Sequence, residues 1–198
     1  MEIDDFTLIQ VNKPSGWKKV EVVNNPTSYE LIGRGMQGAV FKLPNQKCVK
    51  IYPDEKHCRW EEEVLSKVQK SPFFPKLYDS GANYIIIEYV EGITLKDYLK
   101  NMETIPLEIT QQIITIFKEM EHLKFTDYDI YLRHFMVTNN KTLKVIDHVK
   151  SFTRNRPQPK YFFEDLSNLG LLESFLSQAQ TIDHSLNDKW KETIEKYL

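Results

Sequence analysis

The fold of this chain is decided by the stretch Gly33-Arg-Gly-Met-Gln-Gly-Ala-Val40, in which three glycines stand at G-x-G-x-x-G spacing. Because glycine has no Cβ, such a loop lets backbone N–H groups approach phosphate oxygens closely. A helix after the loop would favour a dinucleotide-binding fold. The apolar run Ala39–Leu43 and the turn residues Pro44-Asn45 follow instead. This context predicts a β-hairpin that covers phosphates, with glycines that merely punctuate a hairpin as the simpler alternative.

Up to about residue 90 the pattern is mainly that of short strands. A charged helix with apolar residues at helical spacing is expected over Asp54–Gln69. Two further strands, Phe6–Val11 and Trp17–Val23, are expected in the first 27 residues. The main predicted strands are Tyr29–Gly33, Gly38–Leu43, Lys47–Tyr52, Lys76–Gly81 and Asn83–Val90.

After Gly92 the pattern becomes helical, with one short β pair at Phe135–Thr138 and Leu143–Ile146. The predicted helices run from Thr94 to about Asn101, from Pro106 onward, over Tyr161–Gln178 and over Ser185–Tyr197. A mostly β N-terminal part and a mostly helical C-terminal part indicate an α+β fold with two lobes. A loop is expected over Ser151–Lys160, and basic side chains within it and just before it are either solvated or bind an acidic or phosphorylated substrate; these are Lys150, Arg154, Arg156 and Lys160.

The composition is that of an ordinary soluble protein of 198 residues, with 41% hydrophobic and 27% charged residues. A net charge of −2 provides no electrostatic reason to expect nucleic acid or an anionic membrane as a partner. Apolar runs such as Tyr84–Ile87 are too short to span a bilayer, and the acidic opening Met1-Glu-Ile-Asp-Asp is unlike a signal peptide. Of the two cysteines, Cys48 is expected to be a buried free thiol, which fits a cytoplasmic protein.

The segment Cys48-Val-Lys50-Ile resembles the V-A-I-K strand of the protein-kinase family. The resemblance implies that Lys50 holds the α- and β-phosphates of ATP and that Glu61 of the following helix forms an ion pair with it. Glu62 and Glu63 are alternatives for that role, and a solvated face of the helix is the simpler explanation of all three glutamates.

The stretch from Pro75 to Leu95 resembles the fourth and fifth strands and the hinge of the same family. There the backbone of Glu88–Val90 would meet adenine and Ile87 would lie at the back of the adenine pocket. The resemblance therefore implies ATP contacts from Gly33, Gly35, Gly38, Val40, Lys50, Ile87, Glu88 and Val90.

The catalytic half resembles the family in part. Asp147-His-Val stands where the family has D-F-G, which implies that Asp147 binds Mg²⁺, with Mn²⁺ as an alternative ion. Asp129, eighteen residues earlier, occupies the position of the catalytic aspartate that accepts the proton of the acceptor hydroxyl. His134 replaces the metal-binding asparagine of the family, and imidazole is a poorer ligand for Mg²⁺ than an amide oxygen.

Other departures from the family concern control and substrate docking. Asp127 and Tyr128 replace the histidine and arginine before the catalytic aspartate, so control through a phosphorylated activation loop is not expected. Val149 replaces the glycine of D-F-G, which should restrict the backbone at that turn. There is no A-P-E segment, and only 51 residues follow Asp147.

The sequence thus resembles a small, truncated, bacterial-type serine/threonine protein kinase forming one domain over residues 1–198. We expect an N-terminal extension at 1–27, an N-lobe at 28–90 and a reduced C-lobe at 91–198. The expected activity is ATP-dependent phosphorylation of a hydroxyl on a protein or small molecule. The alternatives are a pseudokinase that binds nucleotide or protein, and a small-molecule kinase of the same fold. Nothing in the sequence specifies the oligomeric state.

Overall fold

The computed structural model describes residues 5–197, and the chain divides into two compact units. The first unit contains the residues up to 70 together with 75–90, and the second contains 71–74 together with the residues from 91 onward. Antiparallel sheets combine with several helices, which confirms the predicted α+β class. The interpretation of the units as an N-lobe at 28–90 and a C-lobe at 91–198 of one domain stays a prediction. Residues 1–4 of the expected extension and Leu198 lie outside the described residues.

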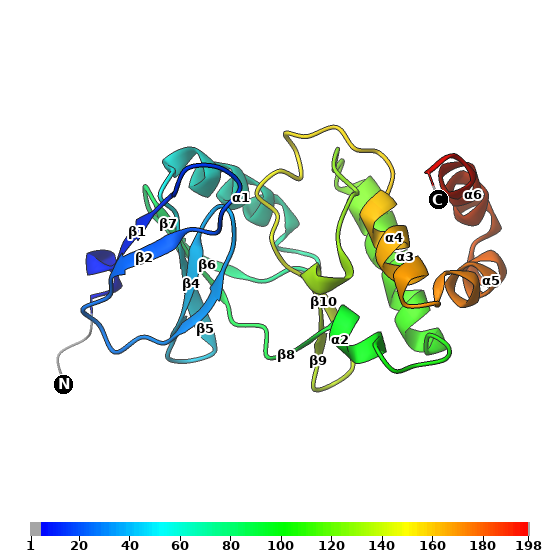
Figure 1. Ribbon diagram of the computed structural model, residues 1–198, viewed down its shortest axis with the longest axis horizontal. Helices are drawn as coiled ribbons and strands as arrows, with labels where there is room; N and C mark the ends of the chain where they lie inside the picture. The colour runs from blue at the N-terminus through cyan, green and yellow to red at the C-terminus, as the bar shows by residue number, and fades with distance from the viewer. Residues whose placement is uncertain (1–4, 198) are drawn as a thin grey trace. The chain divides into compact units, whose positions relative to one another are not determined.

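The first unit is built on an antiparallel sheet of five strands in the order β3-β4-β5-β7-β6 (Figure 1). One helix, α1 (Glu55–Val68), follows β5 and begins where the Asp54 carboxylate accepts a hydrogen bond from the Lys56 N–H at 2.9 Å. The strands are β3 (Leu31–Arg34), β4 (Ala39–Leu43), β5 (Lys47–Ile51), β6 (Leu77–Ser80) and β7 (Tyr84–Glu88).

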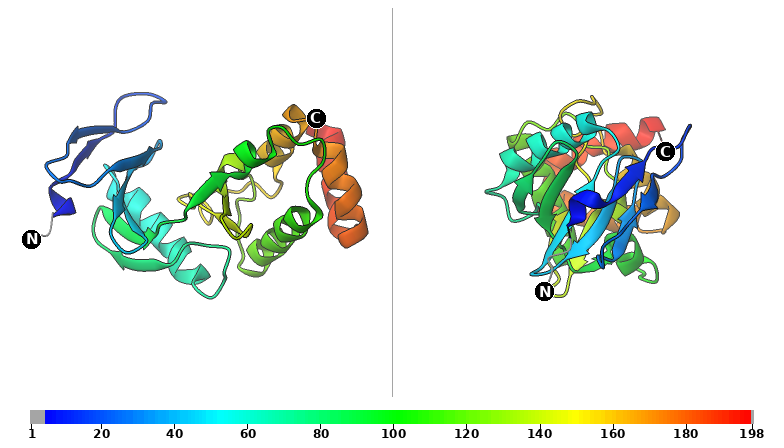
Figure 2. Two further views of the ribbon diagram at one scale, coloured as in Figure 1. Left: turned by 90° about the horizontal axis from the view of Figure 1, so that it is seen from below. Right: turned by 90° about the vertical axis from the view of Figure 1, so that its left-hand side faces the viewer.

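The two faces of this sheet are covered by different elements, as Figure 2 shows. Val49 and Ile51 of β5 lie on one face, in an apolar cluster that includes Ile9 and Val20 from the N-terminal segment. Lys50 lies on the opposite face and contacts α1, because successive side chains of a strand alternate between faces. The elements of the N-terminal segment are the short 3₁₀ helix η1 (Phe6–Leu8) and the antiparallel pair β1 (Gln10–Asn12) and β2 (Glu21–Asn24).

Both strands predicted in the first 27 residues are shorter than expected. The segment Phe6–Val11 begins as a 3₁₀ turn, because the Asp5 carboxylate accepts the Thr7 N–H at 2.9 Å. The segment Trp17–Val23 forms β2 only from Glu21, and the chain bends at residues 15–17, where Gly16 has φ 78°.

The second unit combines a small antiparallel sheet with most of the helices (Figure 1). Its strand order is β10-β9-β8, so the predicted pair gains a third strand that sequence reasoning missed. The strands are β8 (Gly92–Thr94), β9 (Phe135–Thr138) and β10 (Leu143–Val145). The helices are α2 (Leu95–Leu99), α3 (Leu107–His122), α4 (Lys160–Asn168), α5 (Leu172–Ile182), α6 (His184–Tyr197) and the 3₁₀ turn η2 (Leu132–His134).

Aromatic side chains hold the helices of this unit together. Phe117 of α3 meets Phe162 of α4 and Trp190 of α6 with ring centroids 5.4 and 5.5 Å apart, and Phe162 meets Phe175 of α5 at 5.3 Å. All four rings are buried and meet edge to face. This packing fixes α4, whose first turn contacts the predicted catalytic segment.

The single helix predicted over Tyr161–Gln178 is wrong, because two helices occupy that stretch. α4 ends at Asn168, and Gly170 just beyond it has φ 71°, the left-handed conformation that favours glycine. The Gly170 N–H binds the Ser167 carbonyl and the Leu171 N–H binds the Leu166 carbonyl, each at 2.9 Å, which is the Schellman arrangement. Over the described part of the chain, no helix has the length and apolarity needed to cross a membrane.

Candidate active site

The glycine stretch forms the turn of the β3–β4 hairpin, where the Gly35 N–H binds the Gly38 carbonyl at 2.9 Å. Gly38 has a packing reason to be glycine, because a Cβ there would lie 2.8 Å from the Ile51 carbonyl oxygen. Gly33 and Gly35 have none, since a Cβ on either would meet nothing closer than 4.0 and 3.9 Å respectively and neither has a positive φ. The structure therefore explains one glycine of the three by packing.

Lys50 lies on β5 directly opposite Val40 of β4 and reaches a carboxylate on α1. Its Nζ is 2.6 Å from Glu61 Oε2, and Lys50 and Glu61 are only 8% and 2% exposed. The Tyr52 hydroxyl donates to the same oxygen at 2.7 Å. The buried ion pair is thus held by a third side chain, which sequence reasoning missed although Tyr52 shares a strand face with Lys50.

The other two glutamates of α1 have partners of their own. Glu62 accepts a hydrogen bond from the Ser80 hydroxyl at 2.5 Å, and Glu63 forms an exposed ion pair with Lys67 at 2.6 Å. Glu61 is therefore the one of the three that contacts Lys50.

The predicted hinge follows β7, whose Ile87 pairs with Cys48 of β5 in antiparallel register. The Glu88 N–H is engaged by the Lys76 carbonyl at 2.8 Å and the Tyr89 N–H by the Gln46 carbonyl at 2.9 Å. Within residues 5–197, the backbone of Val90 makes no hydrogen bond. A half-buried N–H and C=O at Val90 are therefore available to a ligand.

In the second unit, the Asp129 carboxylate is engaged at both oxygens. Its Oδ1 accepts the Tyr161 N–H at 2.6 Å, and its Oδ2 accepts Nη1–H of Arg156 at 2.8 Å. Asp129 is 8% exposed. Burial raises the pKa of the Asp129 carboxyl above its ordinary value, and the Tyr161 N–H and Arg156 oppose that rise. Arg156, predicted in a basic loop, is thus a partner of two carboxylates, because Asp127 binds it as well.

His134 and Asp147 come close to each other in the same unit. His134 ends η2, and its Nε2 lies 3.9 Å from Asp147 Oδ2, with 21% and 37% of the two side chains exposed. Asp147 has φ 67°, a conformation that costs an aspartate energy and is enriched at functional sites. Val149 is buried and has no positive φ, so the strain expected from the missing glycine lies at Asp147 instead.

A carboxylate and an imidazole are chemically suited to a divalent cation, although imidazole favours Mn²⁺ over Mg²⁺. Within residues 5–197, no group of three or more His, Cys, Asp or Glu side chains is arranged to hold a metal ion. A cation bound by Asp147 and His134 would therefore need phosphate oxygens or water as further ligands, which is how Mg²⁺ is held with nucleotides.

Asp165 is a buried carboxylate that sequence reasoning missed. It lies on α4, where it accepts the Leu132 N–H at 3.1 Å and binds Lys96 Nζ at 2.7 Å. It thereby ties η2 and α2 to α4. The available signal was an acidic residue at helical spacing among Phe162, Phe163 and Leu166.

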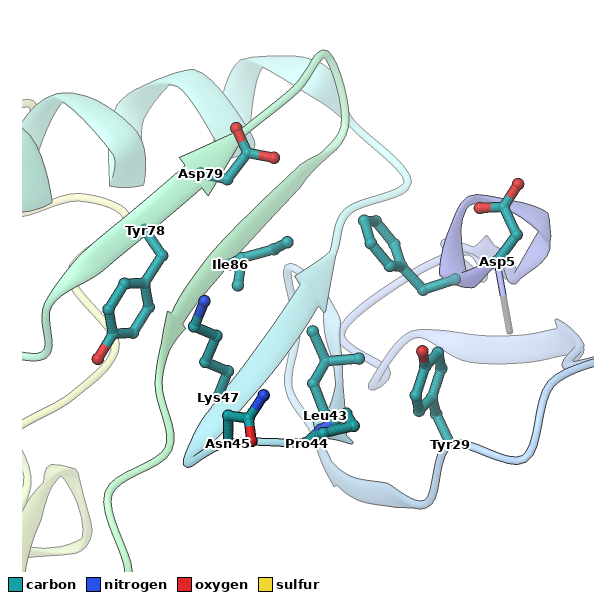
Figure 3. A pocket seen from close by; sticks show the side chains of 10 residues that line it. Asp5, Tyr29, Leu43, Pro44, Asn45, Lys47, Tyr78, Asp79 and Ile86 are labelled. Atoms are coloured by element: carbon teal, nitrogen blue, oxygen red, sulfur yellow. The ribbon is translucent and has the colours of Figure 1, made fainter. Parts of the chain in front are cut away.

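A cavity of about 710 Å³ lies on the first unit, on the side of the sheet that carries η1 (Figure 3). Aromatic and aliphatic side chains line most of it, and Lys47 stands beside Tyr78 with its ammonium 4.5 Å from the ring centroid. None of the predicted site residues is among its ten lining residues.

No protein-family model matches the chain. It is 28% identical over 122 residues to the Bacillus subtilis protein named "Putative serine/threonine-protein kinase YrzF", covering 59% of this chain and 57% of that protein. It is 31% identical over 144 residues to "Probable serine/threonine-protein kinase CPE1738" of Clostridium perfringens, covering 60% of this chain and 21% of the relative. It is 27% identical over 158 residues to "Dual specificity protein kinase zakA" of Dictyostelium discoideum, covering 69% of this chain and 20% of that protein.

The chain thus spans little more than half of one of these relatives and about a fifth of the other two. Similarity to several proteins named as kinases, together with the α+β fold, relates this chain to the protein-kinase superfamily.

Proposed function

We propose that this chain is an ATP-dependent phosphotransferase of the protein-kinase type, which transfers the γ-phosphate to a hydroxyl, nominally of serine or threonine. The observation that carries the proposal is the buried ion pair of Lys50 and Glu61, at 2.6 Å. A buried ion pair contributes little net stability, since desolvation of both charges offsets their attraction. Kinases need this pair to orient the lysine toward the α- and β-phosphates.

Two features of the backbone in the first unit support ATP as the ligand. Gly33 and Gly35 lack a packing reason to be glycine, and close approach of phosphate oxygens would supply one. The backbone of Val90, which makes no hydrogen bond to any described residue, would bind adenine in the manner expected of a hinge. Ile87 and Glu88 keep their predicted adenine-pocket roles, and Val40 keeps its predicted ATP contact, as part of this proposal.

In the proposed reaction the acceptor oxygen bonds to the γ-phosphorus of ATP, the bond between that phosphorus and the β–γ bridging oxygen breaks, and ADP leaves. Asp129 accepts the proton of the acceptor hydroxyl. Lys50 balances charge on the α- and β-phosphates. Asp147 and His134 would hold Mg²⁺ or Mn²⁺, which when bound neutralises charge on the transferring phosphoryl group.

A second candidate is a pseudokinase that binds nucleotide without transfer, and the contacts of Asp129 favour it. Helix α4 begins after Pro159 without a side-chain cap of its own, and the Asp129 carboxylate binds the N–H of its second residue, Tyr161. A carboxylate at a helix N-terminus stabilises that helix without any catalytic role. Capping of α4 would by itself explain why an aspartate stands at position 129.

Transfer from radiolabelled ATP tests the first candidate. Wild-type chain, Asp147→Asn and Asp129→Asn are compared with Mg²⁺ and with Mn²⁺, using protein acceptors and small hydroxyl compounds. We expect label transfer by the wild type and its loss in both variants. Equal signal from wild type and Asp147→Asn would contradict phosphotransfer by this site.

Thermal stabilisation by ATP separates the two candidates. ATP at a hundred times its Kd should stabilise the chain by about 2.7 kcal/mol, and Lys50→Met should abolish that effect. Stabilisation of the wild type without transfer to any acceptor would favour the pseudokinase.

A further inference from the structure

The side chain of Arg156 joins two carboxylates of the predicted catalytic segment. Its Nε and Nη2 bind Oδ1 and Oδ2 of Asp127 at 3.0 and 2.7 Å, a bidentate pair. Its Nη1 binds Oδ2 of Asp129 at 2.8 Å, and Nη2 also lies 3.4 Å from the Asp129 carbonyl. Only the planar guanidinium can reach both carboxylates in this way, because lysine offers a single point charge.

The backbone of Arg156 is fixed as well. Its N–H binds the Thr126 carbonyl at 2.9 Å, and its carbonyl accepts the Tyr128 N–H at 2.8 Å, which makes a short parallel bridge. The loop that carries Arg156 is therefore joined to the catalytic segment by main chain and side chain together. A movement of this loop that released Arg156 from Asp129 would break all of these hydrogen bonds at once. Arg156 is therefore expected to stay bound to Asp129 in the folded chain.

Asp129 remains able to accept a further hydrogen bond while it is held. A carboxylate has about four acceptor positions on its two oxygens. Arg156 occupies one on Oδ2 and the Tyr161 N–H occupies one on Oδ1. The Asp129 N–H in turn binds Oδ1 of Asp127 at 3.0 Å, which fixes the main chain beneath the carboxylate. The contacts thus set the direction of the carboxylate and leave positions for an acceptor hydroxyl.

We propose that Arg156 is the positioning residue of Asp129: anchored by Asp127, its guanidinium fixes the orientation of the Asp129 carboxylate. This inference rests on the proposed phosphotransfer, in which Asp129 is the base. Asp127 and Tyr128 stand where the family has histidine and arginine, so Asp127 serves here to anchor an arginine that comes from a later segment.

The groups around Asp129 act on the pKa of its carboxyl in opposite directions. Burial, the Asp127 carboxylate and the Glu164 carboxylate raise the pKa of Asp129, whereas the Tyr161 N–H and Arg156 lower it. Without Arg156 the two neighbouring buried carboxylates of Asp127 and Asp129 would lose the cation that they share. The titratable and charged groups that face Asp129 are Asp127, Tyr131, Arg156, Tyr161 and Glu164.

The test compares Arg156→Gln and Arg156→Lys with Arg154→Gln in the full chain. Arg154 lies two positions before Arg156, and its side chain contacts neither carboxylate. Arg154→Gln therefore removes the same charge without removing the contacts. The first readout is the titration of the Asp129 carboxyl carbon, followed by NMR in ¹³C-labelled protein. We expect a higher pKa in Arg156→Gln, an intermediate value in Arg156→Lys and the wild-type value in Arg154→Gln.

The second readout is the pH profile of phosphotransfer. We expect kcat of Arg156→Gln to fall by about 100-fold, the order of loss when a general base is misplaced, with the acid limb of its profile at higher pH and the KM for ATP unchanged. Arg156→Lys should recover part of the loss.

An unchanged titration of Asp129 in a folded Arg156→Gln chain would overturn the inference. If that variant does not fold, an unchanged titration in Arg156→Lys would do so. An inactive wild-type chain would overturn the phosphotransfer instead, while the titration still decides whether Arg156 governs the charge of Asp129.

Discussion

At the scale of single residues, Glu61, Glu62 and Glu63 show how position on a helix assigns different roles to identical side chains. Successive residues of an α-helix point about 100° apart. Glu61 therefore faces the sheet and Lys50, Glu62 reaches the Ser80 hydroxyl, and Glu63 lies in solvent beside Lys67. The Lys50–Glu61 pair differs from the Glu63–Lys67 pair in its burial, since both consist of a lysine and a glutamate.

Replacing each of two neighbouring glutamates tests this difference. Glu61→Gln leaves the Lys50 ammonium buried without a countercharge, so we expect a loss of roughly 3 kcal/mol in the free energy of unfolding. Glu63→Gln removes an exposed i,i+4 pair and should cost about 0.5 kcal/mol or less. Urea unfolding measures both. Equal losses in the two variants would contradict the assignment.

The two cysteines are buried thiols with weak acidity. Burial raises the pKa of Cys48 and that of Cys58 to about 12 each. Because only the thiolate attacks a disulfide reagent, neither cysteine should react with Ellman's reagent at pH 8 in the folded chain, and both should react in urea. Rapid reaction of either thiol in the native chain would show that it is accessible.

At the scale of elements, the two ends of α4 are completed by different means. Its N-terminus is capped by a side chain distant in sequence, Asp129, and its C-terminus by the local Schellman arrangement at Gly170. Leu166, the third residue from its end, and Leu171, the third beyond it, are both buried. The end of the helix is therefore set by its own sequence, whereas its start depends on the rest of the unit.

Substitution of Gly170 tests the C-terminal cap. An alanine at φ 71° costs about 1 to 2 kcal/mol, so Gly170→Ala should lower the unfolding free energy by that amount. Asparagine tolerates the left-handed conformation better, and Gly170→Asn should cost less than Gly170→Ala. Thermal unfolding followed by circular dichroism measures the order, and a reversed order would argue against the cap.

At the scale of the whole molecule, each unit has its own core, and in the second unit ion pairs add to the aromatic packing. Asp183 stands between α5 and α6, where its Oδ1 accepts the Leu186 N–H at 3.0 Å and its Oδ2 binds Lys118 of α3 at 2.6 Å. The Lys118 ammonium and the two hydrogen bonds from Leu186 and Ser185 hold the pKa of Asp183 well below its ordinary value.

A depressed carboxyl pKa stabilises the fold above the pKa of the unfolded chain, near 3.9, and the stabilisation is lost as the pH falls through the folded value. Lys118 is half exposed, so the contribution should be about 1 kcal/mol or less at pH 7. We expect Asp183→Asn to lose that amount at pH 7 and progressively less below about pH 4. Urea unfolding at several pH values measures the difference. A gap between wild type and variant that widens in acid would contradict the assignment.

Much of the fold was predictable because it is encoded over short distances in the chain. Hairpins follow from alternating apolar residues between turn residues, and the five main strands and α1 lie close to their predicted positions. The third strand, β8, escaped prediction because a three-residue strand such as Gly92–Thr94 has too little pattern to be recognised. The break at Gly170 was visible in sequence as a glycine within a helical pattern, and the apolar spacing on either side concealed it.

By itself, the sequence determined the α+β class, the order of the kinase-like motifs and the placement of Lys50 on a strand before a helix rich in glutamate. Only the tertiary structure decided which glutamate meets Lys50, that the Val90 backbone makes no hydrogen bond within residues 5–197, and that Arg156 contacts Asp129. The physical reason is distance along the chain. Asp129 and Arg156 are 27 residues apart, joined by a loop whose path no local periodicity records. Contacts between residues so far apart in sequence depend on how the chain packs, and they can be identified only in the folded structure.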